Sequence, residues 1–220
     1  AIYVNGGGLT IRDALLVNNG FSQAGDTKYG GAIYANNATV AVNNAYFAYN
    51  FLSVQTGARG GGVCINGGNA RFTTCTFRGN YAAGNIPWGG AIAAINADSV
   101  TLSNCNFSTN YAYTTAPAGN ALYCSGVGTL RIQDTIMTNN MGGSSVLGPE
   151  NILANITTLL TMERSVVASG TGRGLVKLGG GQAFISNCLF ALNSSNGVHV
   201  GTGMVTFANV TLAYNNGWGM

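Results

Sequence analysis

Apolar and polar residues alternate along eight short segments of the chain, and each segment ends on one large apolar residue. In the fourth segment Val100 and Leu102 flank polar Thr101, and Phe107 follows five residues after Leu102. Alternation with a period of two is typical of a β-strand with one buried face. The large residues, called anchors here, are separated by 31, 30, 30, 30, 30, 23 and 22 residues and are Leu16, Phe47, Phe77, Phe107, Met137, Val167, Phe190 and Leu212.

Other positions at fixed distances from the anchors repeat their residue type. The residues seven and five before each anchor are apolar, and the polar residues three before it indicate a bend: Asp13, Asn44, Thr74, Asn104, Asp134, Arg164, Asn187 and Asn209. Like residues in register at such periods predict a solenoid of stacked parallel strands. We therefore predict an all-β fold, a right-handed parallel β-helix of about eight turns roughly 4.8 Å apart, as one domain over residues 1–220. A βαβ array is excluded because no interval shows a helical period.

A column of asparagines follows the anchors by three residues. In-register asparagines can hydrogen-bond from turn to turn through their side-chain amides. We predict such a ladder, interrupted where Gly170 stands in place of asparagine. Its members are Asn19, Asn50, Asn80, Asn110, Asn140, Asn193 and Asn215.

The composition limits the environment and the partners. Only 7% of the residues are charged and 46% are hydrophobic, so the polar surface is made of Asn, Ser, Thr and Gly, which is common outside cells. The net charge of +3 comes from scattered bases with no basic run, which argues against nucleic acid as a partner. No apolar stretch is long enough for a transmembrane segment. We expect an extracellular or cell-surface protein.

Two short motifs carry a resemblance to a known family. GGAI at 30–33 and 89–92, with FAYN, FRGN and FSTN around the anchors, resembles the GGA[I/L/V] and FxxN motifs of polymorphic outer membrane proteins. The resemblance covers turns one to five well and turns six to eight weakly. It implies a β-helix that forms the passenger of a secreted adhesin, and it implies no cofactor and no particular activity.

The first strand of each turn has an outward stripe that is unusually apolar. Contiguous exposed apolar patches mark contact surfaces, so the stripe is a candidate interface. The alternative is that the longer loops of turns one to five cover it, and both interpretations stay open. Trp88, in one of these loops, is a further candidate for packing on a partner protein or on carbohydrate. The stripe consists of Tyr3, Tyr34, Ile65, Ala93, Tyr123 and Leu153, followed by Lys177 and His199.

Residues for catalysis or metal binding are sparse. β-Helix enzymes that degrade acidic polysaccharides use clustered carboxylates, but the best aligned pair, Asp13 and Asp134, lies four turns apart, roughly 19 Å. That separation is too large for either glycosidase geometry. A flat threonine array for ice binding is interrupted by Arg71, Arg131 and Phe184. We expect no catalytic site, no metal and no cofactor, and an exposed ion pair between Asp134 and Arg164.

The thiols and the glycosylation sequons give two further expectations. Cys75, Cys105 and Cys188 fall in a small inward column, and Cys64 and Cys124 fall at inward positions of the first strand. We therefore expect buried free thiols, with a Cys75–Cys105 disulfide as the alternative. If the source is eukaryotic, Asn106 and Asn37 are the candidate glycosylation sites.

These patterns favour a non-catalytic structural or adhesive segment of a secreted or cell-surface protein. The alternative is a polysaccharide lyase or hydrolase of the pectate-lyase-like class. Neither end of the chain has a polar cap, and exposed strand edges invite pairing. We therefore expect an excerpt of a longer repeat array, or copies that associate end to end or laterally into a filament or coat.

Overall fold

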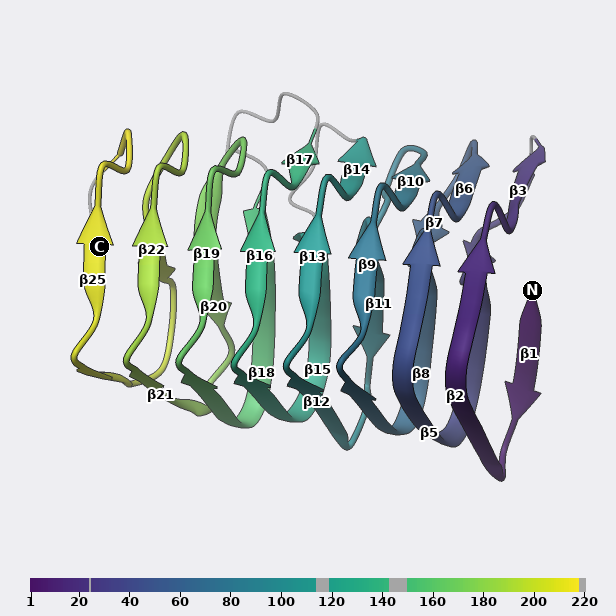
Figure 1. Ribbon diagram of the computed structural model, residues 1–220, viewed down its shortest axis with the longest axis horizontal. Helices are drawn as coiled ribbons and strands as arrows, with labels where there is room; N and C mark the ends of the chain where they lie inside the picture. Colours follow the sequence, from purple (N-terminus) through teal and green to yellow (C-terminus); the bar gives the residue numbers. More distant parts are fainter. Residues whose placement is uncertain (24, 114–118, 143–149, 218–220) are drawn as a thin grey trace.

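The computed structural model describes residues 1–23, 25–113, 119–142 and 150–217. All regular structure in these ranges is β-strand, and the strands wind into one parallel solenoid (Figure 1). The predicted all-β parallel fold is confirmed.

Eighteen strands join one continuous sheet. They are β1 (Ile2–Asn5), β2 (Gly8–Val17), β5 (Ile33–Ala48), β8 (Val63–Thr73), β9 (Thr76–Arg78), β11 (Ile92–Ile95), β12 (Ser99–Ser103), β13 (Asn106–Ser108), β15 (Gly119–Gln133), β16 (Ile136–Thr138), β18 (Glu150–Glu163), β19 (Val166–Ala168), β20 (Arg173–Leu178), β21 (Gln182–Ser186), β22 (Leu189–Ala191), β23 (Val198–Val200), β24 (Val205–Ala208) and β25 (Thr211–Ala213).

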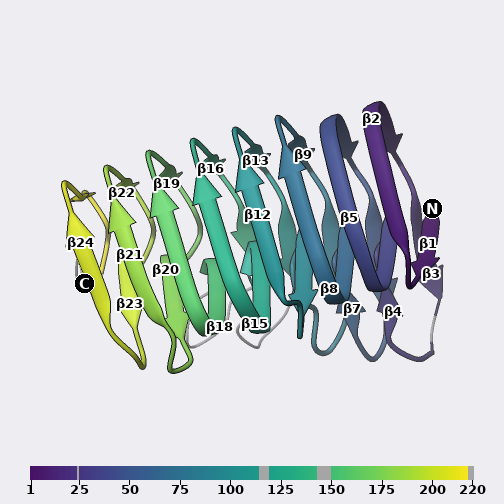
Figure 2. The same cartoon turned by 90° about the horizontal axis from the view of Figure 1, so that it is seen from below.

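Parallel pairing places equivalent residues of successive coils side by side. We number the coils one to eight by one in-register series: Leu9, Val40, Ala70, Val100, Leu130, Leu160, Ala183 and Val205. Each coil has three faces, which in coil four are formed by β11 (first face), β12 (second face) and β13 (third face). Figure 1 looks onto the third face, and Figure 2 looks from below onto the second.

The bend between the second and third faces has the same backbone conformation in every coil. Its central residue has a positive φ of 45° to 54°, a region that Asn and Asp tolerate better than most residues. The predicted polar bend column therefore has a conformational cause. Its members are Asp13, Asn44, Thr74, Asn104, Asp134, Arg164, Asn187 and Asn209.

The anchors form the centre of the core. The ring centroids of Phe47 and Phe77 are 4.7 Å apart and those of Phe77 and Phe107 are 4.6 Å apart, with nearly parallel planes. Phe72 meets Phe77 edge-on at 5.5 Å. All four side chains are fully buried. These residues are vertical neighbours in the interior, as the repeat predicts.

The asparagine ladder is also present. Nδ2 of Asn50 donates to Oδ1 of Asn80 at 2.9 Å, and Nδ2 of Asn80 donates to Oδ1 of Asn110 at 2.9 Å. At the predicted break, Asn151 of coil six fills the space beside Gly170 and donates from Nδ2 to Oδ1 of Asn193 at 3.1 Å. Asn151, which comes from a different strand, thus supplies the donor to Asn193, while its own Oδ1 accepts no hydrogen bond from the described residues, so the ladder resumes at Asn151 rather than running on from Asn140.

The excursions after the ladder are strands rather than irregular loops in the first five coils. They form a second parallel sheet of β3 (Gly20–Gln23), β6 (Phe51–Val54), β10 (Tyr81–Ala83), β14 (Tyr111–Tyr113) and β17 (Met141–Gly142), seen along the upper edge of Figure 1. A small core of Leu52, Val54, Ala58 and Ala82 lies beneath it. Two short strands, β4 (Lys28–Tyr29) and β7 (Ala58–Arg59), then lead back to the first face.

Candidate functional site

The first-face stripe differs from its prediction in coils three and seven. Ile65 pairs with Ala35 and Ala94 and lies in the core, so its assignment to the outward stripe and to an interface was wrong. Gly60, with φ of 74°, occupies the bend position that Gly30 occupies in coil two. The predicted register of this strand was therefore out by one residue, and a shift of one residue moves every side chain of a strand to the opposite face. In coil seven, Lys177 likewise occupies the inward register. The observed outward column is Tyr3, Tyr34, Cys64, Ala93, Tyr123, Leu153, Val176 and His199.

The chain itself covers this column in coils two to five. Tyr29 stacks on Tyr34 with ring centroids 4.8 Å apart, and Trp88 stacks on Tyr123 at the same distance. The Arg59 guanidinium lies between Tyr29 and Trp88, 5.2 Å and 4.2 Å from their ring centroids. Returning loops therefore bury the middle of the stripe, which was the alternative left open by the sequence.

The six predicted interface residues consequently have different environments. Ile65 and Leu153 are buried, and Tyr34, Tyr123 and Trp88 are half-buried in ring stacks. Tyr3 is 64% exposed and stacks on Tyr34 at 5.2 Å. Among the predicted members, Tyr3 alone keeps a largely open side chain.

Desolvation governs the titratable groups of this covered region. Burial raises the pKa of Cys64 to about 12, although the nearby Arg59 charge opposes the shift. Burial also raises the pKa of Tyr34 and of Tyr123. These groups are neutral at physiological pH, so the covered stripe is a structural cluster rather than a reactive one.

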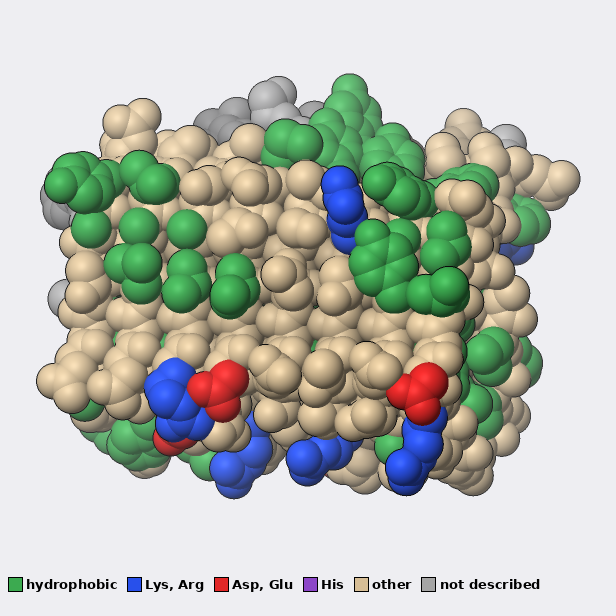
Figure 3. Space-filling model, viewed as in Figure 1, with side chains coloured by type: hydrophobic (Ala, Val, Ile, Leu, Met, Phe, Trp, Pro, Cys, Tyr) green, Lys and Arg blue, Asp and Glu red, His purple; other side chains and the backbone are tan. Residues whose placement is uncertain are grey.

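Aromatic side chains also gather on the outer sheet. Phe51, Tyr81, Tyr111 and Met141 are in register, and the ring centroids of Tyr81 and Tyr111 lie 5.6 Å apart. Tyr113 stacks on Tyr111 at 5.9 Å. The apolar crest at the top of Figure 3 lies over this sheet. Because the rings stack face to face, only their edges and hydroxyl groups are accessible to a ligand at this crest.

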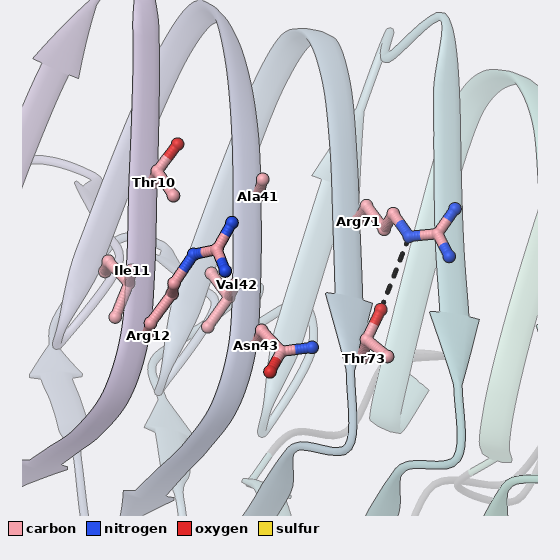
Figure 4. A pocket seen from close by; sticks show the side chains of 8 residues that line it. All are labelled: Thr10, Ile11, Arg12, Ala41, Val42, Asn43, Arg71 and Thr73. Carbon is pink, nitrogen blue, oxygen red and sulfur yellow. Dashed lines mark hydrogen bonds between the residues drawn. The ribbon is translucent and has the colours of Figure 1, made fainter.

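The second face carries the groove shown in Figure 4. Ala41 is small and lies in register between Thr10 and Arg71, which leaves a hollow of about 180 Å³ beside Arg12 and Asn43. Nε of Arg71 donates to Oγ1 of Thr73 at 3.3 Å, and its guanidinium leans over the next coil. The groove is lined by basic, amide, hydroxyl and apolar side chains, with no carboxylate among its lining residues.

Three arginines make the second face basic. Arg12, Arg71 and Arg131 are exposed, and within the described ranges none of them forms an ion pair. Basic side chains line the lower edge of Figure 3, where this face begins. By contrast, Arg164 pairs with Asp134 at 2.7 Å and with Glu163 at 3.3 Å, which confirms the predicted ion pair. We take the second face as the candidate binding site.

The carboxylates do not come together into a catalytic arrangement in the described part of the chain. Asp13 and Asp134 stay in one bend column on coils one and five. Among the described residues, no group of three or more His, Cys, Asp or Glu side chains could hold a metal ion. Glu150 is buried and lies 3.7 Å from Arg173.

The five cysteines are free and buried. Cys124 is inward as predicted, whereas Cys64 faces outward beneath the returning loops. Sγ of Cys75 and of Cys105 donate to the carbonyls two residues earlier, at 3.3 Å and 3.4 Å. Contact between the two thiols lowers the pKa of Cys75 and raises that of Cys105, and burial opposes the ionisation of both. The expectation of free buried thiols is confirmed.

The two candidate glycosylation asparagines are both accessible. Asn106 is exposed at the start of β13 on the third face. Asn37 is exposed at the bend after the first face, with φ of 48°. Their modification stays a prediction.

One buried cation was missed by the sequence analysis. Lys177 is fully buried, and its Nζ donates to the carbonyls of Gly179, Gly181 and Thr202. The glycine run 179–181 after it is the signal that was available, because such a run can turn its carbonyls inward around an ammonium group. This lysine holds the bends of coils seven and eight together.

Comparisons with protein-family models, with curated proteins and with solved structures each return no match. In the part of the chain that the structure describes there is no helix long and apolar enough to cross a membrane. The fold is therefore established by geometry: the chain is a parallel β-solenoid with a basic second face.

Proposed function

We propose that this chain is a non-catalytic, structural or adhesive segment of a secreted or cell-surface protein. Its repeats would then be of the kind found in polymorphic outer membrane proteins, as the GGAI and FxxN motifs suggest. The observation that carries the proposal is the second face, an open and regular surface whose groove is lined by Arg12, Arg71 and Asn43 rather than by a pair of carboxylates. Glycoside hydrolysis usually uses two carboxyl groups about the scissile bond.

The surface chemistry supports a role outside the cell. Charged residues are 7% of the chain, and Asn, Ser and Thr side chains supply most of the remaining polar surface. Such a surface suits contact with glycans and neighbouring proteins, because neutral amides and hydroxyls donate and accept hydrogen bonds without the desolvation cost of a charge.

A combined binding and turnover assay tests this role. The purified chain is immobilised and offered an array of glycans and cell-surface preparations. In parallel it is incubated with polygalacturonate, while the unsaturated products of a lyase are followed by absorbance and the new reducing ends made by a hydrolase are followed by a colorimetric assay. Saturable binding without cleavage supports the adhesive role. Cleavage that disappears in an Asp13→Asn or Asp134→Asn variant overturns it in favour of the lyase or hydrolase alternative.

Lateral association of copies is a second candidate, favoured by apolar side chains on the third face. Leu15 and Val17 are exposed at one end, and Ile136 and Leu192 are exposed toward the other. Figure 3 shows these two apolar areas separated by a polar middle. Sedimentation velocity over a range of concentrations tests the idea. Self-association that weakens in Leu15→Thr supports a filament or coat, and a constant monomer contradicts it.

A further inference from the structure

The outward column at the centre of the second face alternates between large and small side chains. Parallel pairing puts Arg71 on coil three, Arg131 on coil five and Phe184 on coil seven in one line. The coils between them carry the smaller Thr101 and Thr161, and Thr206 follows on coil eight. Coils one and two carry Thr10 and Ala41 in the same line, so the alternation runs from coil three to coil eight. With coils about 4.8 Å apart, the large groups recur roughly every 9.6 Å.

We propose that this column binds a linear anionic polysaccharide that runs along the solenoid axis and in which a charged group of one kind, a carboxylate or a sulfate, recurs on every second sugar. Arg71 and Arg131 bind successive charges, and Phe184 stacks on a sugar ring further along. The inference rests on the proposed adhesive role and names its ligand class.

The charge on this face favours an anion. The guanidinium groups of Arg71 and Arg131 are exposed and have no acidic partner among the described residues. Glu163, which lines the same hollow as Arg131 from the neighbouring coil, is paired with Arg164. Arg12 adds a third positive charge beside the groove. An arginine fork binds a carboxylate or a sulfate through two parallel hydrogen bonds, so either group fits this chemistry.

The small residues between the large ones contribute hydrogen bonds. Thr101 and Thr161 are half-buried between longer neighbours, so their hydroxyls lie at the floor of a corrugated surface. A hydroxyl both donates and accepts, which suits the hydroxyl groups of a sugar ring. The uncharged sugar of each pair therefore meets a neutral polar floor.

Phe184 is the aromatic side chain whose environment best suits a sugar. It is 44% exposed, and its in-register neighbours are Thr161 and Thr206 rather than other rings. The rings of Tyr81 and Tyr111, by contrast, stack on each other and occupy their own faces. A free aromatic face is the surface on which the C–H side of a pyranose can pack, and it explains an otherwise costly exposed phenylalanine.

Nucleic acid fits this face less well. A DNA duplex carries a charge about every 1.7 Å along its axis, and binding depends on neutralising several phosphates at once. Single strands are held by successive aromatic rings under their bases. Here two arginines are separated by a neutral coil, and one phenylalanine follows two coils further on. This arrangement suits a polymer whose charges are further apart than the phosphates of a nucleic acid.

Binding to four polymers tests the proposal. Hyaluronan carries a carboxylate on every second sugar, chondroitin sulfate adds sulfate, polygalacturonate carries a carboxylate on every sugar, and dextran is neutral. Biolayer interferometry of the whole chain at two salt concentrations measures each Kd. Saturable, salt-sensitive binding of hyaluronan or chondroitin sulfate, and none of dextran, supports the proposal. Preference for chondroitin sulfate identifies sulfate as the ligand group, and equal binding identifies the carboxylate.

Single variants locate the site. Arg71→Gln and Arg131→Gln should each weaken binding roughly tenfold or more, the loss expected for a hydrogen-bonded ion contact. Phe184→Thr copies its two neighbours in the column and should weaken binding without changing the charge. Arg78→Gln is the matched control, because Arg78 is an exposed arginine on the third face, and its Kd should be unchanged.

Three results would overturn the inference: equal effects of Arg71→Gln and Arg78→Gln, binding of polygalacturonate alone, or equally tight binding of a short DNA duplex. Adhesion to cell surfaces that persists in Arg71→Gln/Arg131→Gln would overturn the assignment of this face while leaving the adhesive role in place. Cleavage of a polymer by the unmodified chain would instead remove the adhesive role. All four substituted side chains are exposed, so the variants should fold, which circular dichroism verifies.

Discussion

The guanidinium of Arg59 lies 4.2 Å from the centroid of the Trp88 ring, within the covered part of the first face. Tyr29 lies on its other side at 5.2 Å, so one cation is enclosed by two aromatic rings that come from neighbouring coils. Beneath them are Cys64 and Ala93, both fully buried. This arrangement closes an apolar stripe that would otherwise face water.

Removing the charge of Arg59 should loosen this cover. We expect Arg59→Met, which keeps an unbranched side chain, to reduce the free energy of unfolding by roughly 1–2 kcal/mol, since cation–π contacts contribute about 0.5–2 kcal/mol each. Urea denaturation followed by tryptophan fluorescence measures the change. Arg78→Met, on an exposed side chain of the third face, is the control. Equal midpoints for the two variants would show that the enclosed cation contributes nothing.

Much of this fold could be predicted because stacking forces residues about thirty apart into contact. Phe47, Phe77 and Phe107, and the asparagines three residues after them, are equivalent in sequence and neighbours in space. The bend column was recognisable because a positive φ selects Asn and Asp. The cover of the first face also had a sequence signal, since Tyr29, Arg59 and Trp88 recur at intervals of 30 and 29 residues.

The errors arose where glycine or a charge obscured the register. Three consecutive glycines, 60–62, do not show which one forms the bend, and the wrong choice moved Ile65 to the outside. With Val176 and Leu178 as the inward pair, the alternation predicts Lys177 outward, yet Lys177 is buried and three backbone carbonyls accept its ammonium protons. Asn151 comes from outside the repeat column, so no periodicity could assign it to the ladder.

The role of Asn151 in the ladder gives a prediction opposite to the one the repeat suggests. Gly170→Asn restores the asparagine that the sequence repeat has at this position. Because the Asn151 side chain already fills the space that a side chain at 170 would need, we expect the variant to be destabilised. Asn151→Ala alone should cost roughly 1–3 kcal/mol, because it leaves Oδ1 of Asn193 with one donor fewer in the interior. The double variant should recover much of the loss. A double-mutant cycle from urea denaturation measures the coupling, and simple additivity would contradict this account.

A strained bend in coil seven should respond to glycine. Leu192 has φ of 56° and is 59% exposed, and the equivalent position in coil three is Gly79, with φ of 61°. A left-handed conformation costs an L-residue about 1–2 kcal/mol, partly offset by the greater flexibility of glycine in the unfolded chain. Leu192→Gly should therefore stabilise the fold by about 0.5–1 kcal/mol. Thermal unfolding measures this gain, and Leu189→Gly, within strand β22, should be destabilising.

The buried phenol of Tyr123 should make stability depend on pH in the alkaline range. Desolvation raises its pKa above the ordinary value of 10.0, while a hydrogen bond with Ser125 and the Arg59 charge oppose the shift. Above about pH 10 the unfolded chain therefore releases this proton before the folded chain does, and the folded state binds more protons. Stability must then fall as the pH rises toward the folded pKa. Tyr123→Phe should have a shallower decline between about pH 9 and pH 11. The remainder is due to the other groups whose pKa is raised, which include Tyr34, Tyr81 and Tyr111 and the buried thiols of Cys64, Cys124 and Cys188. Guanidinium denaturation of both proteins at several pH values gives the two slopes. Parallel plots of stability against pH for the two proteins would mean that the Tyr123 hydroxyl is exposed to water. That result would contradict the cover by Trp88 that the ring stacking indicates.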